Sequence, residues 1–283
     1  MIRRVAVLGA GTMGHGIAHA AIAAGCETRL FDVDHAALIR AQAAVGEILD
    51  KAVALGKLSS AEVASTVARL STASRLETAL ADVDLVIEAA PERLDLKLRL
   101  FADIDRLAPA TAIVATNTSA LSITEIAATL TNPARAAGMH FFNPVHKMKL
   151  IEVVRGLETA EATLDALRGV AAAMGKEAVV VRESPGFITT RVNASIGNEA
   201  FYMLLEGVAS AEDIDKALKL GLNHPMGPFE LVDLVGLDTR LSILEYLHRT
   251  LGEKYRPCPL LVQYVKAGRL GRKVGRGVYE YPR

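Results

Sequence analysis

The sequence predicts an α/β fold, with a doubly wound and mostly parallel sheet followed by an all-α domain. The first two-thirds of the chain alternates short apolar runs with helical segments, which is typical of such sheets. A glycine-rich turn follows the first apolar run. At Glu183-Ser184-Pro185-Gly186 the alternation stops, and the remainder is helical in pattern. We therefore expect two domains, residues 1–184 and 185–283.

The expected elements follow in chain order. Strands are expected at 5–8, 28–31, 84–89, 112–115, 136–142, 150–154 and 178–182. Helices are expected from the glycine-rich turn through Ala24, then at 94–107, 122–130 and 163–174. A helical insertion at 36–70 is expected to hold two helices with a break at 55–60. In the second domain helices are expected at 187–206, 211–219, 228–248 and 258–267, with turns at Gly221, Pro225 and Gly227.

Composition narrows the class of protein. The 283 residues are 51% hydrophobic, which supplies a sizeable core, and 32 basic residues balance 32 acidic ones. The balance gives no field to attract nucleic acid or an anionic membrane, and no apolar run is long enough to cross a bilayer. Cys26 and Cys258 lie outside any metal-ligand spacing, so we expect no metal. No signal peptide precedes the first strand. We expect a soluble cytoplasmic protein that acts on a small molecule.

A G-x-G-x-x-G pattern follows the first strand and begins the first helix, and this context makes the pattern specific. Its first glycine permits the tight turn, its second lets backbone N–H groups approach a pyrophosphate, and its third lets helix and strand pack closely. The helix N-terminus adds positive potential. We expect a dinucleotide to bind Gly9, Ala10, Gly11, Thr12, Met13 and Gly14.

Asp32 ends the second strand. A carboxylate at this position accepts hydrogen bonds from the adenosine ribose and repels a 2′-phosphate, and no arginine follows at once to bind that phosphate. The sequence therefore favours NAD over NADP. The alternative is that Asp32 is an ordinary helix N-cap.

Polar residues follow the next two strands, at positions that lie beside the nicotinamide in this kind of sheet. Glu88, Glu92 and Lys97 follow one strand, and Asn117, Thr118 and Ser119 follow the other. From spacing alone, the two glutamates fit solvated charges at a helix start, and the second group fits helix N-caps. We count Asn117 among the expected cofactor contacts.

Two apolar strands each contain one titratable residue, His140 and Glu152. A buried carboxylate is costly unless it accepts a hydrogen bond. An imidazole partner would satisfy it and would in turn be fixed in one tautomer, as in other acid–base pairs. A neutral histidine of this kind can accept the proton of an alcohol. The alternative is a core histidine with ordinary partners. We expect His146, in the polar turn between the strands, to be solvated.

The chain resembles the L-3-hydroxyacyl-CoA dehydrogenase family over essentially its whole length, and most closely the short bacterial 3-hydroxybutyryl-CoA dehydrogenases. The resemblance rests on the glycine-rich turn, on Asn117-Thr118-Ser119 and on His140-Phe141-Phe142-Asn143-Pro144. It continues in Lys149-Leu150-Ile151-Glu152-Val153, in Pro185-Gly186-Phe187, and in the family's helical-domain motif Pro225-Met226-Gly227-Pro228-Phe229-Glu230-Leu231.

The resemblance implies a function and a set of roles. It implies NAD-dependent interconversion of (S)-3-hydroxyacyl-CoA, here 3-hydroxybutyryl-CoA, and 3-ketoacyl-CoA by a homodimer. His140 would be the catalytic base, Glu152 its orienting partner, and Ser119 a hydrogen-bond partner of the reacting oxygen. Lys51 would meet the phosphates or pantetheine of CoA. The implied cofactor contacts are Glu92, Lys97, Ser119, Asn143 and Lys273.

The chain departs from the family at one position. Thr190 stands where the family commonly has an asparagine that would polarise the substrate. A threonine hydroxyl donates one hydrogen bond but reaches less far. Asn193, nearly one helical turn later, is an alternative donor.

Two other functions remain open from the residues. A related dehydrogenase could act on a free hydroxy acid or sugar acid, and it would have little use for Lys51. A non-catalytic NAD-binding protein would bind nucleotide without turnover, but it would have no need to bury the charge of Glu152.

Overall fold

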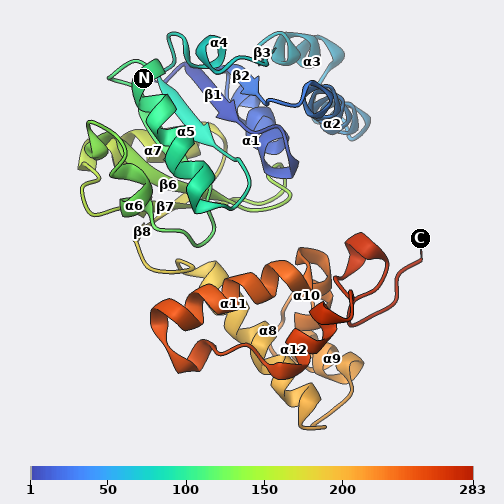
Figure 1. Cartoon of the computed structure of the whole chain (residues 1–283). Coiled ribbons are helices and arrows are strands. Elements are labelled where there is room, and N and C mark those ends of the chain that lie inside the picture. Colours follow the sequence, from blue (N-terminus) through green and yellow to red (C-terminus); the bar gives the residue numbers. More distant parts are fainter. Residues whose placement is uncertain (1, 283) are drawn as a thin grey trace. The chain divides into compact units, whose positions relative to one another are not determined.

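The computed structural model describes residues 2–282. They divide into two compact units, with the boundary between Glu183 and Ser184. The first unit contains every strand of the sheet, and the second consists of helices and irregular segments (Figure 1).

The first unit is built on an eight-stranded sheet with the strand order β3-β2-β1-β4-β5-β6-β7-β8. All neighbouring strands are parallel except β6 and β7, which are antiparallel. This confirms the predicted fold class. The strands are β1 (Arg4–Leu8), β2 (Glu27–Phe31), β3 (Leu70–Ala73), β4 (Leu85–Glu88), β5 (Ile113–Thr116), β6 (Ala136–Phe141), β7 (Leu150–Arg155) and β8 (Glu177–Arg182).

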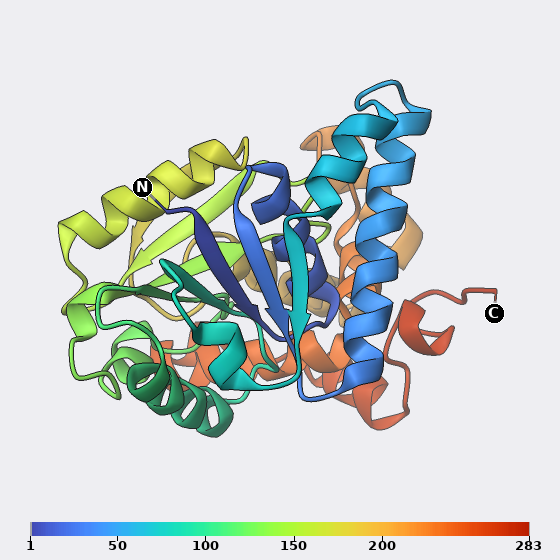
Figure 2. The same cartoon turned by 90° about the horizontal axis from the view of Figure 1, so that it is seen from above.

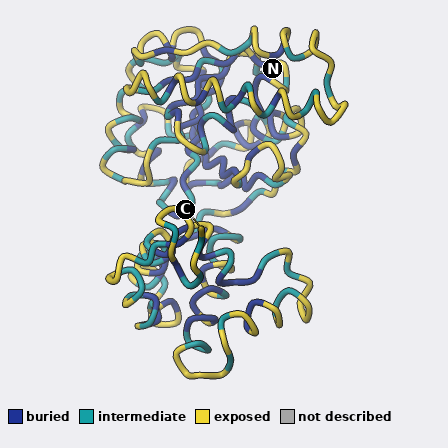
Figure 3. Tube along the Cα trace, turned by 90° about the vertical axis from the view of Figure 1, so that its right-hand side faces the viewer, coloured by how far each residue is buried: buried dark blue, intermediate teal, exposed yellow. Residues whose placement is uncertain are grey.

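Helices cover both faces of this sheet, as Figure 2 shows from above. Side chains alternate between the faces, so Val5 and Val7 of β1 pack in one core cluster while Ala6 and Leu8 pack in the other. The first cluster includes residues of α1 (Thr12–Ala23) and α7 (Glu161–Ala173), and the second includes residues of α4 (Leu76–Leu80), α5 (Leu94–Leu107) and α6 (Ile123–Ala127). Figure 3 shows that the buried segments of this unit lie in its interior and that most exposed segments lie at its periphery.

The segment expected to be a helical insertion forms the crossover between β2 and β3. Its helices are α2 (His35–Ala54) and α3 (Ser60–Val67), and α3 begins with a capping box in which Ser59 and Glu62 bond each other's backbone N–H groups. Strand β3 and helix α4, which follow α3, were not predicted from the sequence. Strand β3 has the sequence LSTA and is mostly exposed at the sheet edge, so it lacks the apolar run that predicts a buried strand.

The second unit packs its helices around one apolar core. The long helix expected at 228–248 was a wrong prediction, because the chain breaks at Gly236, whose φ of +103° is not helical. The helices of the second unit are α8 (Thr189–Leu205), α9 (Ala211–Gly221), α10 (Pro228–Val235), α11 (Leu237–Leu251) and α12 (Pro259–Lys266). The 3₁₀ turns of the chain are η1 (Pro133–Arg135), η2 (Glu253–Tyr255) and η3 (Arg272–Val274).

Candidate active site

The glycine-rich loop connects β1 to α1 by a close approach of backbone to backbone. Gly9 has a φ of +106°, and a side chain on Gly14 would collide with the carbonyl oxygen of Gly9. Gly11, the residue before α1, has a φ of −73°, and a Cβ added there would meet no protein atom within 4 Å. Neither packing nor backbone strain therefore requires glycine at position 11. The absence of a side chain there instead suits the close approach of a ligand to the helix N-terminus.

Asp32 lies beside this loop at the end of β2. Its carboxylate accepts hydrogen bonds from the backbone N–H of Ala10 at 2.8 Å and of Asp34 at 2.9 Å. Each oxygen keeps a further lone pair for a ribose hydroxyl. The alternative that Asp32 caps a helix is wrong, because the N-cap of α2 is Asp34, whose side chain accepts from the N–H of Ala36.

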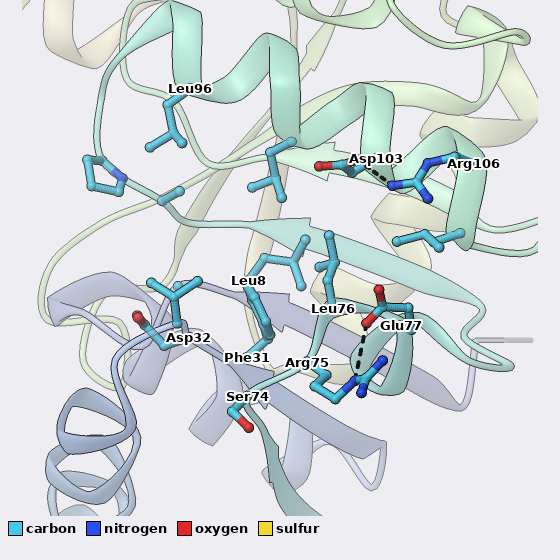
Figure 4. A pocket seen from close by; sticks show the side chains of 16 residues that line it. Leu8, Phe31, Asp32, Ser74, Arg75, Leu76, Glu77, Leu96, Asp103 and Arg106 are labelled. Carbon is cyan, nitrogen blue, oxygen red and sulfur yellow. Dashed lines mark hydrogen bonds and ion pairs between the residues drawn. The ribbon is translucent and has the colours of Figure 1, made fainter.

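A pocket of about 640 Å³ lies next to the loop and to Asp32. Figure 4 shows Leu8, Phe31, Leu76 and Leu96 among the side chains that line it, with Asp32 at one side. An apolar pocket that ends at a carboxylate fits an adenine with its ribose. The glycine loop, Asp32 and this pocket together fit the adenosine and pyrophosphate of a dinucleotide.

His140 and Glu152 are direct partners across the antiparallel pair β6–β7. Residues at opposed positions of a sheet point to the same face, and His140 Nδ1 lies 2.8 Å from Glu152 Oε2. Both residues are buried, at 5% and 1% exposure. Because a carboxylate accepts, Nδ1 carries the hydrogen in the neutral ring and Nε2 is left as an acceptor. Ser119 Oγ lies 3.1 Å from that Nε2.

Asn117, Thr118 and Ser119 do not cap a helix, contrary to that interpretation, because α6 begins after the N-cap Ser122. Asn117 Oδ1 accepts the backbone N–H of Phe141 at 2.8 Å, which fastens the end of β5 to the end of β6. Asn117 thereby supports the strand that carries His140.

The interpretation of Glu88 as a solvated charge was wrong. Glu88 is completely buried and pairs with Lys97, which is 1% exposed. Thr116 Oγ1 also donates to Glu88. Glu92 is exposed, and its carboxylate accepts from Thr118 Oγ1 at 2.5 Å and from the backbone N–H of Ser119 at 2.9 Å. The spacing of residues along the sequence could not predict these contacts, because they join segments that are distant in the chain and adjacent only in the folded sheet.

The other predicted site residues make none of the hydrogen bonds described above. Lys51 is exposed on α2 and lies 3.9 Å from Glu47, and Asn143 is exposed between β6 and β7. Thr190 lies in the first turn of α8, in the second unit. In that unit too, Lys273 pairs with Asp238, Nζ to oxygen, at 2.6 Å.

Comparisons with known proteins match both units. Residues 4–184 match the family described as "3-hydroxyacyl-CoA dehydrogenase, NAD binding domain", and residues 186–281 match its C-terminal domain. The chain belongs to the 3-hydroxyacyl-CoA dehydrogenase family. It is therefore an NAD-dependent oxidoreductase, in agreement with the cofactor predicted from the glycine loop and Asp32.

Individual relatives of the 3-hydroxyacyl-CoA dehydrogenase family cover the whole chain. A Bacillus subtilis protein named "Probable 3-hydroxybutyryl-CoA dehydrogenase" is 49% identical over 99% of this chain and 98% of its own. The 3-hydroxybutyryl-CoA dehydrogenase of Bradyrhizobium diazoefficiens is 45% identical over 99% of this chain and 96% of its own. The crystal structure of (S)-3-hydroxybutyryl-CoA dehydrogenase from Ralstonia eutropha superposes with a TM-score of 0.96 at 44% identity, covering 100% of both chains.

Residues 2–282 contain neither a candidate membrane-spanning helix nor a candidate metal site. No helix there combines the length and the apolar character needed to span a membrane. No group of three or more His, Cys, Asp or Glu side chains there is arranged to hold a metal ion.

Proposed function

We propose that this chain interconverts (S)-3-hydroxybutyryl-CoA and acetoacetyl-CoA, with His140 and Glu152 as its acid–base pair. The observation that carries the proposal is the hydrogen-bonded row Glu152–His140–Ser119, with distances of 2.8 and 3.1 Å. Oxidation of an alcohol requires a base to accept the hydroxyl proton, a carboxylate to orient that base and a hydroxyl to bind the reacting oxygen, and these three side chains are of those types.

In the oxidation, His140 Nε2 accepts the proton of the substrate's 3-hydroxyl. Glu152 accepts the Nδ1–H bond throughout and stabilises the imidazolium that forms. Ser119 Oγ, near Nε2, is placed to hydrogen-bond the same substrate oxygen. Bound NAD⁺ supplies the acceptor for the hydride that leaves carbon 3. In the reverse direction, protonated His140 returns the proton to the oxygen of acetoacetyl-CoA.

The remaining roles follow from the family resemblance and are part of the proposal. Residues 1–184 would bind NAD, and residues 185–283 would supply the substrate cleft and the dimer contact. The cofactor contacts would be Glu92, Lys97, Ser119, Asn143 and Lys273. Lys51 would contact the CoA, and Thr190 or Asn193 the substrate. A homodimer is supported by exposed apolar side chains in the second unit, among them Leu205, Val208 and Leu220. Two buried free thiols, Cys26 and Cys258, fit a reducing compartment such as the cytoplasm.

The test is oxidation of NADH by acetoacetyl-CoA, followed by absorbance and run beside free acetoacetate and beside NADPH. We expect rapid turnover only with the CoA ester and NADH. Turnover of free acetoacetate at a similar rate would indicate a hydroxy-acid dehydrogenase instead. Binding of NADH without turnover of either substrate would indicate a non-catalytic protein.

Variants then test the acid–base pair. We expect His140→Ala and Glu152→Gln each to lower kcat by about 10³-fold, since both lose the oriented base. Glu177→Gln, an exposed carboxylate on β8, is the matched control and should retain wild-type kcat. Near-normal turnover by Glu152→Gln would contradict the role of the pair.

A further inference from the structure

A second pocket in the first unit is lined by apolar and basic side chains and by no carboxylate. Its volume is about 890 Å³, and α1, α2, α3 and the segment 146–149 line it. None of its lining residues belongs to the pocket beside Asp32. Its polar lining consists of Thr66 and six basic residues, Lys51, Lys57, Lys147, Lys149, His19 and His146. This composition suits a ligand with several negative charges.

The segment that carries His146 is held in a defined position. Lys176 Nζ donates to the carbonyl oxygens of Val145 at 2.5 Å and of Met148 at 2.7 Å. Val145 is buried against Gly16 of α1, where an added Cβ would lie 2.9 Å from the valine side chain. His146 and its flanking lysine are therefore fixed beside α1.

His146 and His19 of α1 face each other in this pocket, with ring centroids 6.4 Å apart and nearly perpendicular planes. Burial is the main cause that lowers the pKa of His19, to about 4, and the charges of His146, Lys176 and His15 lower it further. The pKa of His146 is lowered by burial and by Lys147, His15, Lys176 and Lys51. In the free protein both rings are therefore neutral at pH 7.

The two rings differ in how readily they can take a proton. Nδ1 of His19 is enclosed and has no hydrogen-bond partner among residues 2–282. A second N–H on that ring would be buried without an acceptor, which is costly. His146 is exposed, so both of its nitrogens can be hydrated. His146 is the ring that can become charged, and His19 is suited to remain a neutral donor.

We propose that His146 takes up one proton from solvent when the phosphates of the CoA ester, which the proposed function assigns to Lys51, bind in this pocket. The inference rests on the proposed function, since the ligand is that of the dehydrogenase reaction. Burial is the first cause of the lowered pKa of His146, and repulsion from Lys147 and from Lys51 of α2 adds to it. Bound phosphates offset that repulsion. The two carboxylates of α2, Glu47 and Asp50, are outside the lining, and Glu47 Oε2 lies 3.9 Å from Lys51 Nζ. Phosphate binding is therefore tighter at lower pH, by linkage.

The experiment measures binding of adenosine 3′,5′-bisphosphate, the nucleotide part of CoA, to protein saturated with NADH. The NADH keeps the probe out of the dinucleotide site. Calorimetry in buffers of different ionisation enthalpy counts the protons taken up. The wild type is compared with His146→Gln and with His224→Gln, a histidine of the second unit that does not line the pocket.

We expect proton uptake by the wild type and by His224→Gln, and a clear loss of uptake in His146→Gln. From about pH 8 to about pH 6, the affinity of the wild type should rise about three- to tenfold relative to His146→Gln. The phosphates of the probe also titrate in this pH range, but their effect on affinity is the same for both proteins. It therefore cancels when the affinity of the wild type is divided by that of His146→Gln. Lys51→Met and Lys149→Met should weaken binding at both pH values and reduce its dependence on salt.

Equal proton uptake by the wild type and His146→Gln would overturn the proposal and leave the dehydrogenase reaction untouched. Absence of probe binding, or binding unchanged by both lysine substitutions, would overturn the assignment of the pocket. The turnover assay with acetoacetyl-CoA is a separate readout, so failure of the pocket and failure of the proposed function are distinguishable.

Discussion

The ammonium of Lys97 lies 2.7 and 2.8 Å from the two carboxylate oxygens of Glu88, and both side chains are almost completely enclosed. Lys97 also lies 3.5 Å from Glu92, which holds the backbone N–H of Ser119. Ser119 in turn contacts His140. The buried charge of Lys97 in α5 is thus connected to the proposed base through Glu92 and Ser119. The family resemblance implies that Lys97 contacts the cofactor, and this stays a prediction.

Loss of this ion pair should destabilise the fold strongly. Lys97→Met leaves the carboxylate of Glu88 buried without its counter-charge, and we expect a loss of about 3–5 kcal/mol in the free energy of unfolding. Urea unfolding measures it. The double variant Lys97→Met/Glu88→Gln should recover at least about 1 kcal/mol, because no uncompensated charge remains.

The control for this prediction is an exposed ion pair with the same nitrogen-to-oxygen distance. Arg106 and Asp103 also lie 2.7 Å apart, but their side chains are 67% and 46% exposed. Arg106→Met should cost less than about 1 kcal/mol. Similar losses for Lys97→Met and Arg106→Met would contradict the argument from burial.

Glu92 should act as a positioning residue for Ser119. Glu92→Ala removes the acceptor of the Ser119 N–H and of the Thr118 hydroxyl, and we expect kcat with acetoacetyl-CoA to fall about 10- to 100-fold, the worth of a charge-assisted hydrogen bond. Glu92→Gln keeps one carbonyl acceptor and should recover part of kcat. A raised KM for NADH with unchanged kcat would show that Glu92 acts through the cofactor alone.

His19 should make stability depend on pH. Its pKa in the folded protein, about 4, is below the ordinary value of 6.5. The unfolded chain therefore binds this proton first, so the stabilisation is complete above pH 6.5 and is lost as pH falls toward 4. Between about pH 7.5 and about pH 5, the wild type should lose about 2 kcal/mol more than His19→Gln.

Urea unfolding at the two pH values measures that difference, and His224→Gln is the control that should keep the wild-type pH dependence. Parallel curves for the wild type and His19→Gln would mean that His19 takes a proton in the folded protein as readily as in the unfolded chain. The neutral-donor role assigned to it in the basic pocket would then fail.

Gly236 should be intolerant of a side chain. Its φ is +103°, and an added Cβ would lie 2.9 Å from Asp238 Oδ1 and 3.2 Å from Lys273 Nζ. We expect Gly236→Ala to cost about 1–3 kcal/mol from backbone strain, measured by thermal unfolding. Gly221→Ala, at the end of α9 with open space around it, should change stability by less than about 1 kcal/mol. Equal losses of stability in Gly236→Ala and Gly221→Ala would show that the backbone at position 236 adjusts to a side chain without strain.

Local patterns were sufficient for much of the fold. Helix α5 begins and ends where its apolar pattern predicted, at Leu94 and Leu107, and β1 with its glycine loop follows from residues adjacent in the chain. Strand β3 could not be predicted in this way, because its four residues bury little and are ordered by pairing with β2. The helix break at Gly236 was not predicted either, because an isolated glycine within an apolar helical pattern indicates a break only weakly.

By itself the sequence determined the class of this protein: a parallel sheet with a dinucleotide loop, an all-α second unit, and a histidine and a glutamate in neighbouring strands. These features depend on short-range periodicity and turn chemistry, which one stretch of chain carries alone. Only the tertiary structure decided that Glu88 is buried with Lys97, that Glu92 holds Ser119, and that His19 and His146 share a basic pocket. Those relationships depend on distances between segments far apart in the chain, and burial then determines which charges must be paired.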